Sequence, residues 1–250
     1  MFIVQTKFQE VVQFAKAFEV WNSTEIKFAT CSDGPWRYPI LRLLIKVHKK
    51  EIGARGISSG TRWLSNPYAT LLASWLQPVA ASITSVLNDT KDFVDNLQSL
   101  RLEDGERIWT FDVEQLYPTI DLTILRGCVR DACLRFYQGA SKFDITVQIM
   151  MDILDAILLN QIVSVARLGV RENKRFFIQT KGVTTGLICA VQLANIFICE
   201  IDNMMKTDLN LSIKMYKRFI DDICLVSKTS IEMLLSAFSS WNAKHNHYAR

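Results

Sequence analysis

The chain has 250 residues, of which 49% are hydrophobic and 22% are charged. This composition is typical of a folded globular protein and excludes a disordered, collagen-like or low-complexity chain. The 29 basic residues exceed the 25 acidic residues by four, and this mildly basic balance permits nucleic-acid binding without indicating it.

Cysteine usage and hydropathy indicate where the protein works. None of the six cysteines belongs to a CxxC pair, so we expect reduced core thiols in an intracellular protein, nuclear or cytoplasmic. The N-terminus lacks the basic region and long apolar run of a signal peptide. The longest apolar stretches, at 153–165 and 187–199, are short and contain Asn or Gln, so we expect core segments and no membrane span.

The predicted elements are helical at first and then alternate between strands and helices. Residues 1–30 form a helical lead-in, 32–39 a loop, 40–47 a strand, and 68–100 a mostly helical stretch interrupted at Pro78. Then follow a strand at 108–113, helices at 122–137 and 145–159, a hairpin of 161–168 and 175–179, a helix at 185–206, strands at 212–220 and 223–226, and a helix at 231–244. This order predicts an α+β domain with helices packed against an antiparallel sheet.

Three acids stand at the ends of β-prone runs. YKRFIDDICLV (216–226) places Asp221 and Asp222 between two such runs, where a solvated hairpin turn is the plain interpretation. Asp-Asp is a poor turn dipeptide, however, and a divalent cation would reverse the repulsion between its charges. IWTFDVEQLY (108–117) ends a further β run at Asp112. If the two strands are neighbours, the acids meet at one sheet edge, where they can bind Mg²⁺ for an in-line phosphoryl transfer.

Four blocks of sequence extend this interpretation over most of the chain. They are LRLLIKVHKKEIGARGISSGTRW (41–63), FDVEQLYPTI (111–120), QTKGVTTGLICAVQLANIF (179–197) and YKRFIDDI (216–223). In this order they resemble the fingers block and motifs A, B and C of reverse transcriptases, in the form of Penelope-like retroelements, which are related to telomerase catalytic subunits. The resemblance implies a right-hand polymerase with an antiparallel palm sheet packed on helices. Residues 1–110 would be a lead-in with the fingers, and 111–250 a palm with finger-like insertions.

The resemblance implies a role for each acid. Asp112 and Asp221 would be the principal catalytic ligands of two Mg²⁺ ions, with Mn²⁺ as an alternative, and Asp222 would assist. Tyr117 falls where these enzymes place an aromatic gate, which excludes ribonucleotides by collision with their 2′-hydroxyl group. From spacing alone, a core aromatic residue is an equal interpretation of Tyr117.

The same resemblance implies a nucleotide pocket. Val113 and Glu114 would line the triphosphate site, Gln179 and Gly182 would contact the incoming nucleotide, and Gly186 would lie under the template or primer. Glycine suits a place where nucleic acid comes close to the backbone, although an ordinary loop and helix start would also use it.

Positive charge is concentrated in the fingers block. Between Arg42 and Arg62 the sequence has six basic residues and one acid, a charge of +5, whereas the rest of the chain sums to −1. This concentration suits the binding of a triphosphate and a template, and a solvated basic loop is the alternative. We predict triphosphate contacts for Lys49 and Arg55, and a phosphate or template contact for Lys46.

Several positions depart from the family pattern. Gly56 stands in place of a Pro, which removes a fixed φ angle, and Thr185 stands where a Met is usual. Leu187 and Val191 replace a Ser and a Pro. After the last predicted helix the sequence offers neither the thumb nor the endonuclease domain of the family, so we expect a fragment of a longer protein or a decayed reading frame.

These observations predict a retroelement reverse transcriptase, an RNA-directed DNA polymerase that adds dNTPs to the 3′-end of a DNA primer on an RNA template. The first alternative is an inactive polymerase fold that only binds RNA or primer–template, because the thumb is missing. The second is an RNA-templated RNA polymerase, against which Tyr117 argues.

Overall fold

The structure is a computed structural model that describes residues 2–30, 36–47, 53–58, 60, 62–166, 174–208 and 210–244. Its first elements are α1 (Phe2–Ala17), α2 (Ser23–Thr30), β1 (Leu41–Lys46), β2 (Gly53–Ser58), α3 (Asn66–Ala81) and α4 (Thr90–Gln98). They are followed by β3 (Arg107–Asp112), α5 (Leu116–Thr119), α6 (Leu122–Tyr137), α7 (Phe143–Leu158), β4 (Ile162–Ala166), β5 (Lys174–Ile178), α8 (Ala190–Thr207), β6 (Ile213–Phe219), β7 (Asp222–Ser227) and α9 (Ile231–Lys244).

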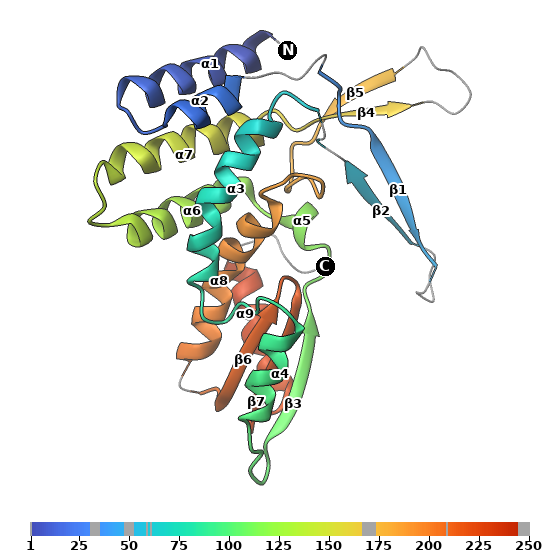
Figure 1. The fold of residues 1–250 in the computed structure, drawn as a ribbon. Helices are drawn as coiled ribbons and strands as arrows, with labels where there is room; N and C mark the ends of the chain where they lie inside the picture. The colour runs from blue at the N-terminus through green and yellow to red at the C-terminus, as the bar shows by residue number, and fades with distance from the viewer. Residues whose placement is uncertain are drawn as a thin grey trace.

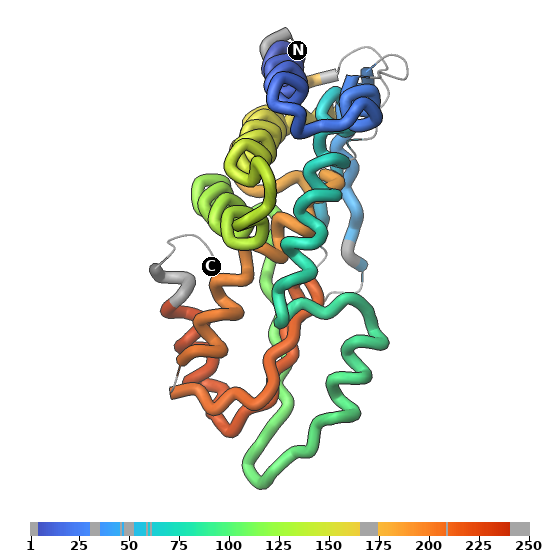
Figure 2. The backbone as a smooth tube through the Cα atoms, turned by 60° about the vertical axis from the view of Figure 1, so that its left-hand side comes forward, coloured from blue at the N-terminus to red at the C-terminus, as the bar shows by residue number. Residues whose placement is uncertain are grey.

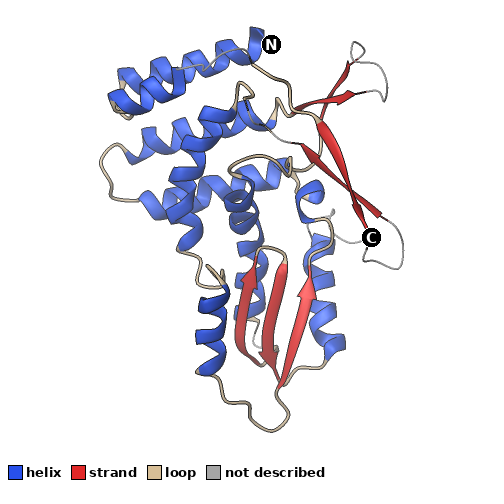
Figure 3. Ribbon diagram, turned by 45° about the vertical axis from the view of Figure 1, so that its right-hand side comes forward, coloured by secondary structure: helices blue, strands red, loops and turns tan. Residues whose placement is uncertain are grey.

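The molecule is elongated, with helices alone at one end and a sheet flanked by helices at the other (Figure 1). A helical body of α1, α2, α3, α6 and α7 lies at one end, and the sheet of β3, β6 and β7 lies at the other (Figure 1). Figure 2 shows the same separation from a second direction. Two antiparallel hairpins, β1–β2 and β4–β5, project together from one side of the body (Figure 3). One end of the three-stranded sheet points toward the side of the molecule from which the two hairpins project (Figure 3).

The three-stranded sheet has the order β3–β7–β6, and both pairings are antiparallel. Its central strand β7 is apolar and is buried after its first residue. One face meets α9 through a ring contact between Phe111 and Phe238. The opposite face, which carries Cys224 and Val226, is covered by Phe93 and its neighbours on α4. Both faces are therefore supported by helices.

The core of the helical body centres on α7, whose sequence is apolar on nearly every face. A helix with this pattern is stable only when it is surrounded by protein. α7 contacts α1, α3 and α6, and Ile149, Met150, Ile153 and Leu154 expose none of their surface. This packing gives the sheet and the hairpins a well-ordered support.

Most predicted elements are present, and two predictions need correction. The predicted helical lead-in is confirmed and consists of two helices, α1 and α2. Pro78 does not interrupt α3, which continues to Ala81. In the segment after the helix, Ser85 and Leu87 form backbone hydrogen bonds with Arg218 of β6. The helix predicted from residue 185 begins at Ala190, because the preceding residues form a loop with side-chain contacts of its own.

The described cysteines are free thiols, with Cys128, Cys133, Cys189 and Cys224 buried and Cys199 partly buried. Cys31 lies outside the described residues. Among the helices that the structure describes, none is long and apolar enough to cross a membrane.

Candidate active site

The strands that carry the three predicted acids are direct neighbours. Asp112, the last residue of β3, is the register partner of Asp222, the first residue of β7. Asp221 lies in the turn between β6 and β7, and its carbonyl oxygen accepts a hydrogen bond of 3.1 Å from the N–H of Val113. The antiparallel pairing thus brings the three acids to one end of the sheet, as the sequence predicts on the condition that the strands are neighbours.

The acids at this end of the sheet influence one another electrostatically. Asp221 is half-buried, whereas Asp112 and Asp222 are exposed. Burial raises the pKa of the Asp221 carboxyl group, and the negative charges of Asp222 and Asp112 raise it further. The positive charge of Arg55 on β2 lowers the pKa of Asp221. The guanidinium group of Arg55 therefore lies close enough to Asp221 to interact with it electrostatically.

The three carboxylates are oxygen donors of the kind that Mg²⁺ and Mn²⁺ take in proteins. Their mutual repulsion is the charge pattern that a divalent cation offsets. In the described part of the chain, no three His, Cys, Asp or Glu side chains stand in an arrangement ready to hold a metal ion. The donor chemistry therefore fits Mg²⁺, and the side chains would need to turn toward one another to bind it.

Tyr117 follows the first acid on the short helix α5. Gln115, just before this helix, has a φ of 49°, and this left-handed residue turns the chain back after β3. Tyr117 is half-buried against the core, and its pKa is raised by burial and by the charge of Asp221. The side chain is thus both a partial core residue and a neighbour of the acids. Val113 beside it is half-buried, and Glu114 is exposed.

Gly182 lies where two backbone segments meet. Its φ is +70°, and a Cβ atom added to it would come within 2.4 Å of the carbonyl oxygen of Tyr117. Val183 donates a hydrogen bond of 2.8 Å to that same oxygen. A close approach within the chain itself therefore requires a glycine at this position. Gln179 is half-buried nearby and accepts a hydrogen bond from Thr184.

The side chain of Gln161, which sequence reasoning missed, forms hydrogen bonds with the loop that contains Gly182 and Thr184. Its side chain is buried; Nε2 donates to the carbonyl oxygen of Gly182 at 3.0 Å, and Oε1 accepts from both N–H and Oγ1 of Thr184. The signal in the sequence that could have indicated this role is the polar pair Asn160–Gln161 between two apolar runs. Gly186 lies farther along, lining a small cavity with Gln161 and Gly60.

Two of the three predicted basic contacts, Lys46 and Arg55, lie on the β1–β2 hairpin. Lys46 is the last residue of β1 and pairs with Gly53, and Arg55 is exposed on β2. Lys49 lies outside the described residues. Thr185 Oγ1 donates a hydrogen bond of 3.1 Å to the carbonyl oxygen of Gly56, which joins the hairpin to the loop before α8.

A cavity of about 520 Å³ opens beside Asp222, between α4 and the sheet. Phe93 on α4 and Phe219 on β6 form apolar walls, and Thr110 and Asp222 supply polar groups. The volume is within the range of ligand pockets, and a few polar groups in an apolar wall are their usual chemistry. Sequence reasoning did not identify Phe93 or Phe219 as part of a site.

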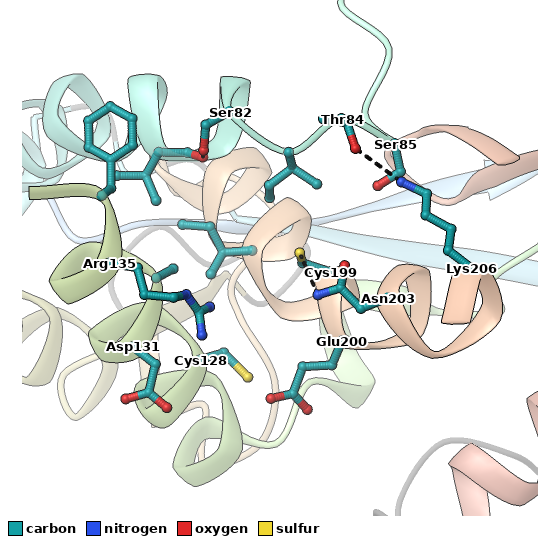
Figure 4. A pocket seen from close by; sticks show the side chains of 15 residues that line it. Ser82, Thr84, Ser85, Cys128, Asp131, Arg135, Cys199, Glu200, Asn203 and Lys206 are labelled. Carbon is teal, nitrogen blue, oxygen red and sulfur yellow. Dashed lines mark hydrogen bonds between the residues drawn. The ribbon is translucent and has the colours of Figure 1, made fainter. Parts of the chain in front are cut away.

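A second cavity, of about 560 Å³, lies between α3, α6 and α8, and none of the three acids lines it (Figure 4). Its walls carry both signs of charge, from Asp131 and Arg135 on α6 and from Glu200 and Lys206 on α8. Burial, and after it the charge of Glu200, raise the pKa of Cys128 to about 12. This thiol is protonated at neutral pH and is a poor nucleophile. The candidate site is therefore the end of the sheet.

Comparison with known proteins identifies the fold. No protein-family model and no curated protein matches the sequence. The structure of apo telomerase from Candida tropicalis, truncated from its C-terminal domain, matches with a TM-score of 0.61 and 10% identity, covering 83% of this chain and 47% of that one. Telomerase from Candida albicans, in complex with the TWJ fragment of telomeric RNA, matches with a TM-score of 0.57 and 12% identity, covering 86% of this chain and 42% of that one. The chain spans less than half the length of these telomerase chains, and it shares with them a polymerase-like fold of helices and antiparallel sheets.

Proposed function

We propose that this chain is the fingers and palm of a retroelement reverse transcriptase, which extends a DNA primer on an RNA template with dNTPs. One observation carries the proposal: Asp112, Asp221 and Asp222 come to one end of an antiparallel sheet in a telomerase-like fold. The four motif-like blocks of the sequence support the retroelement assignment. A palm of this kind would also suit an RNA-templated RNA polymerase, so the substrates are part of the proposal.

The roles of the residues follow from their positions. Asp112 and Asp221 would hold two Mg²⁺ ions with help from Asp222, and these ions would supply the positive charge that stabilises the attacking and leaving oxygens. Arg55, on the projecting hairpin, would bind the triphosphate, since its charge already reaches Asp221. Tyr117 would face the sugar, because it lies between the core and the acids. Phe219, 46% exposed beside Asp222, offers a ring on which a primer base can stack.

Primer extension tests the proposal directly. The purified chain would be given an RNA template, a DNA primer, dNTPs and Mg²⁺, beside Asp112→Asn and Asp221→Asn variants of similar side-chain size. We expect extension by the wild type and a loss of at least about 100-fold in both variants, because each removes a charge that the metal needs. Asp104→Asn is the matched control, since Asp104 is exposed in the turn before β3, at the opposite end of that strand. Extension by Asp112→Asn at the wild-type rate would remove Asp112 from the metal site.

A second candidate is a fold that binds primer–template without chemistry. It is favoured by the observation that, over the residues described, no three potential ligands stand ready around a metal ion. This candidate predicts salt-dependent binding of the RNA–DNA duplex that is unchanged by Asp221→Asn, with no extension by the wild type. A binding titration on the samples used for extension separates the two.

A further inference from the structure

Arg218, on β6, is a charged residue in the middle of the protein. Its side chain exposes none of its surface. All five guanidinium N–H groups have acceptors: Nε and Nη2 reach the Asp202 carboxylate, Nη2 also reaches the carbonyl oxygen of Asn195, and Nη1 reaches Asn195 Oδ1 at 2.8 Å and the carbonyl oxygen of Ile220 at 2.9 Å. Such complete use of the donors fixes the guanidinium plane in one orientation.

The partner of Arg218 is also buried and fixed. Asp202, on α8, exposes none of its side chain and lies 2.9 Å from Arg218 Nη2. It accepts a further hydrogen bond of 2.6 Å from Ser85 Oγ. Ser85 follows the end of α3, at the wall of the second cavity in Figure 4, and its carbonyl oxygen accepts from the N–H of Arg218. The guanidinium is thus anchored to α8 and to the segment after α3.

One hydrogen bond of Arg218 leads to the candidate site. Ile220 has a φ of 56°, and a β-branched residue rarely adopts this left-handed conformation. Strain of this kind persists where the surroundings hold it in place, and it is common at active sites. Arg218 Nη1 binds the carbonyl oxygen of Ile220, and Asp221 is the next residue. On the other side, the N–H of Val113 binds the carbonyl oxygen of Asp221. The turn is therefore held at two consecutive carbonyl groups.

Stability alone gives a weak reason for a buried arginine at this position. A buried ion pair gains little over well-packed apolar residues, because its desolvation offsets its attraction. An apolar side chain of similar length would fill the space, but it could not donate to the carbonyl oxygen of Ile220. The distinguishing property of Arg218 is thus its directed hydrogen bond to the strained turn.

We propose that Arg218 is a positioning residue that holds the left-handed turn at Ile220 and thereby sets Asp221 beside Asp112. The structural part of this inference stands on the contacts above, and its consequence for metal binding rests on the proposed function. The guanidinium acts through the backbone and does not itself touch nucleotide or metal.

Amide hydrogen exchange tests the structural part without any activity. In the wild-type chain, the exchange rate of the Val113 amide should lie within about tenfold of that of the Leu225 amide in the central strand β7. The reason is that the turn whose carbonyl oxygen accepts the hydrogen bond from Val113 is fixed. In the double variant Arg218→Met/Asp202→Asn, which removes both charges and leaves an oxygen for Ser85, the Val113 amide should exchange about tenfold faster or more, and Leu225 should change less. The same selective change is expected in Arg218→Lys, which keeps the charge but lacks the planar fork.

Two results would overturn the inference. One is a wild-type Val113 amide that exchanges as fast as an exposed loop amide; the other is a folded Arg218 variant in which Val113 exchanges as in the wild type. Arg126→Met/Asp155→Asn is the matched control, because it removes an exposed Arg–Asp pair between α6 and α7. This control should leave the exchange rate of the Val113 amide unchanged.

Binding of Mn²⁺, followed by electron paramagnetic resonance, tests the consequence for the metal. We expect the Arg218 variants to bind Mn²⁺ about tenfold more weakly than the wild type and the Arg126 control to bind it equally well. Equal affinity in a folded Arg218 variant would contradict the positioning of Asp221. A wild-type chain that binds no Mn²⁺ would reject the metal site of the proposed function, and amide exchange would still decide the role of Arg218.

Discussion

Replacing Gly182 by alanine should destabilise the protein more than a glycine substitution in an open turn. The new methyl group would lie 2.4 Å from the carbonyl oxygen of Tyr117 and 2.5 Å from that of Pro118, both of which are backbone atoms. Such a clash requires a backbone shift of the kind that costs about 1–3 kcal/mol in overpacked sites. The φ of +70° adds about 1–2 kcal/mol for any residue with a Cβ atom. We therefore expect a loss of about 2–5 kcal/mol in the free energy of unfolding.

The matched control is Gly105→Ala. Gly105 has a φ of +83° but no atom within 4 Å of the position of an added Cβ. The free energy of unfolding of this variant should fall only by the cost of the positive φ angle, about 1–2 kcal/mol. The added methyl group affects the unfolded chain equally in both variants, so that effect cancels in the comparison. Urea denaturation of the three proteins measures the difference. Equal losses in Gly182→Ala and Gly105→Ala would refute the close approach between the Gly182 loop and the backbone after β3.

Two further substitutions test neighbouring contacts. Tyr117→Ala should raise the use of rNTPs relative to dNTPs by about tenfold or more if the ring excludes the 2′-hydroxyl group, and unchanged selectivity in primer extension would leave Tyr117 as a core residue only. Gln161→Leu should lower stability by about 2–4 kcal/mol, because it leaves Thr184 N–H and the Gly182 carbonyl oxygen without their buried partner. Gln148→Leu, on the exposed face of α7, is the denaturation control and should change stability by less than about 0.5 kcal/mol. Similar losses for the two leucine variants would show that the Gln161 network contributes little.

Local periodicity was enough to predict much of the fold. The helix predicted at 122–137 coincides with α6, and the strands predicted around Asp112 and Asp221 correspond to β3, β6 and β7. These elements have a clear apolar repeat and are bounded by a turn or a cap; Asp121, for instance, caps the start of α6 by accepting hydrogen bonds from the N–H groups of Thr123 and Ile124. Where one face of an element is buried, its own sequence carries the information.

Contacts between distant segments could not be predicted in this way. The pairing of β3 with β7 brings together residues more than 100 positions apart in the sequence. From the sequence, this pairing was only an assumption on which the predicted acid cluster depended. Pro78 looked like a helix break because its ring removes a hydrogen bond, yet α3 is held by buried neighbours on both sides of it, Leu76 and Val79. The roles of Arg218 and Gln161 lie outside what local sequence can predict, because the identity of a polar residue does not reveal its distant partners, Asp202 and the Gly182 loop.

Two departures from the reverse-transcriptase pattern, Gly56 and Thr185, looked independent in the sequence and are in contact in the structure. Thr185 Oγ1 donates to the carbonyl oxygen of Gly56 across 129 positions of sequence. Thr185→Val keeps the shape of the side chain and removes the donor, so it should weaken the attachment of the β1–β2 hairpin to the loop before α8. Amide exchange in β1 and β2 should become about threefold to tenfold faster, because a partly exposed hydrogen bond contributes about 0.5–1.5 kcal/mol, while exchange in β4 and β5 should stay as it was. A uniform change in both hairpins would mean that the threonine supports the helical body instead of the contact with Gly56.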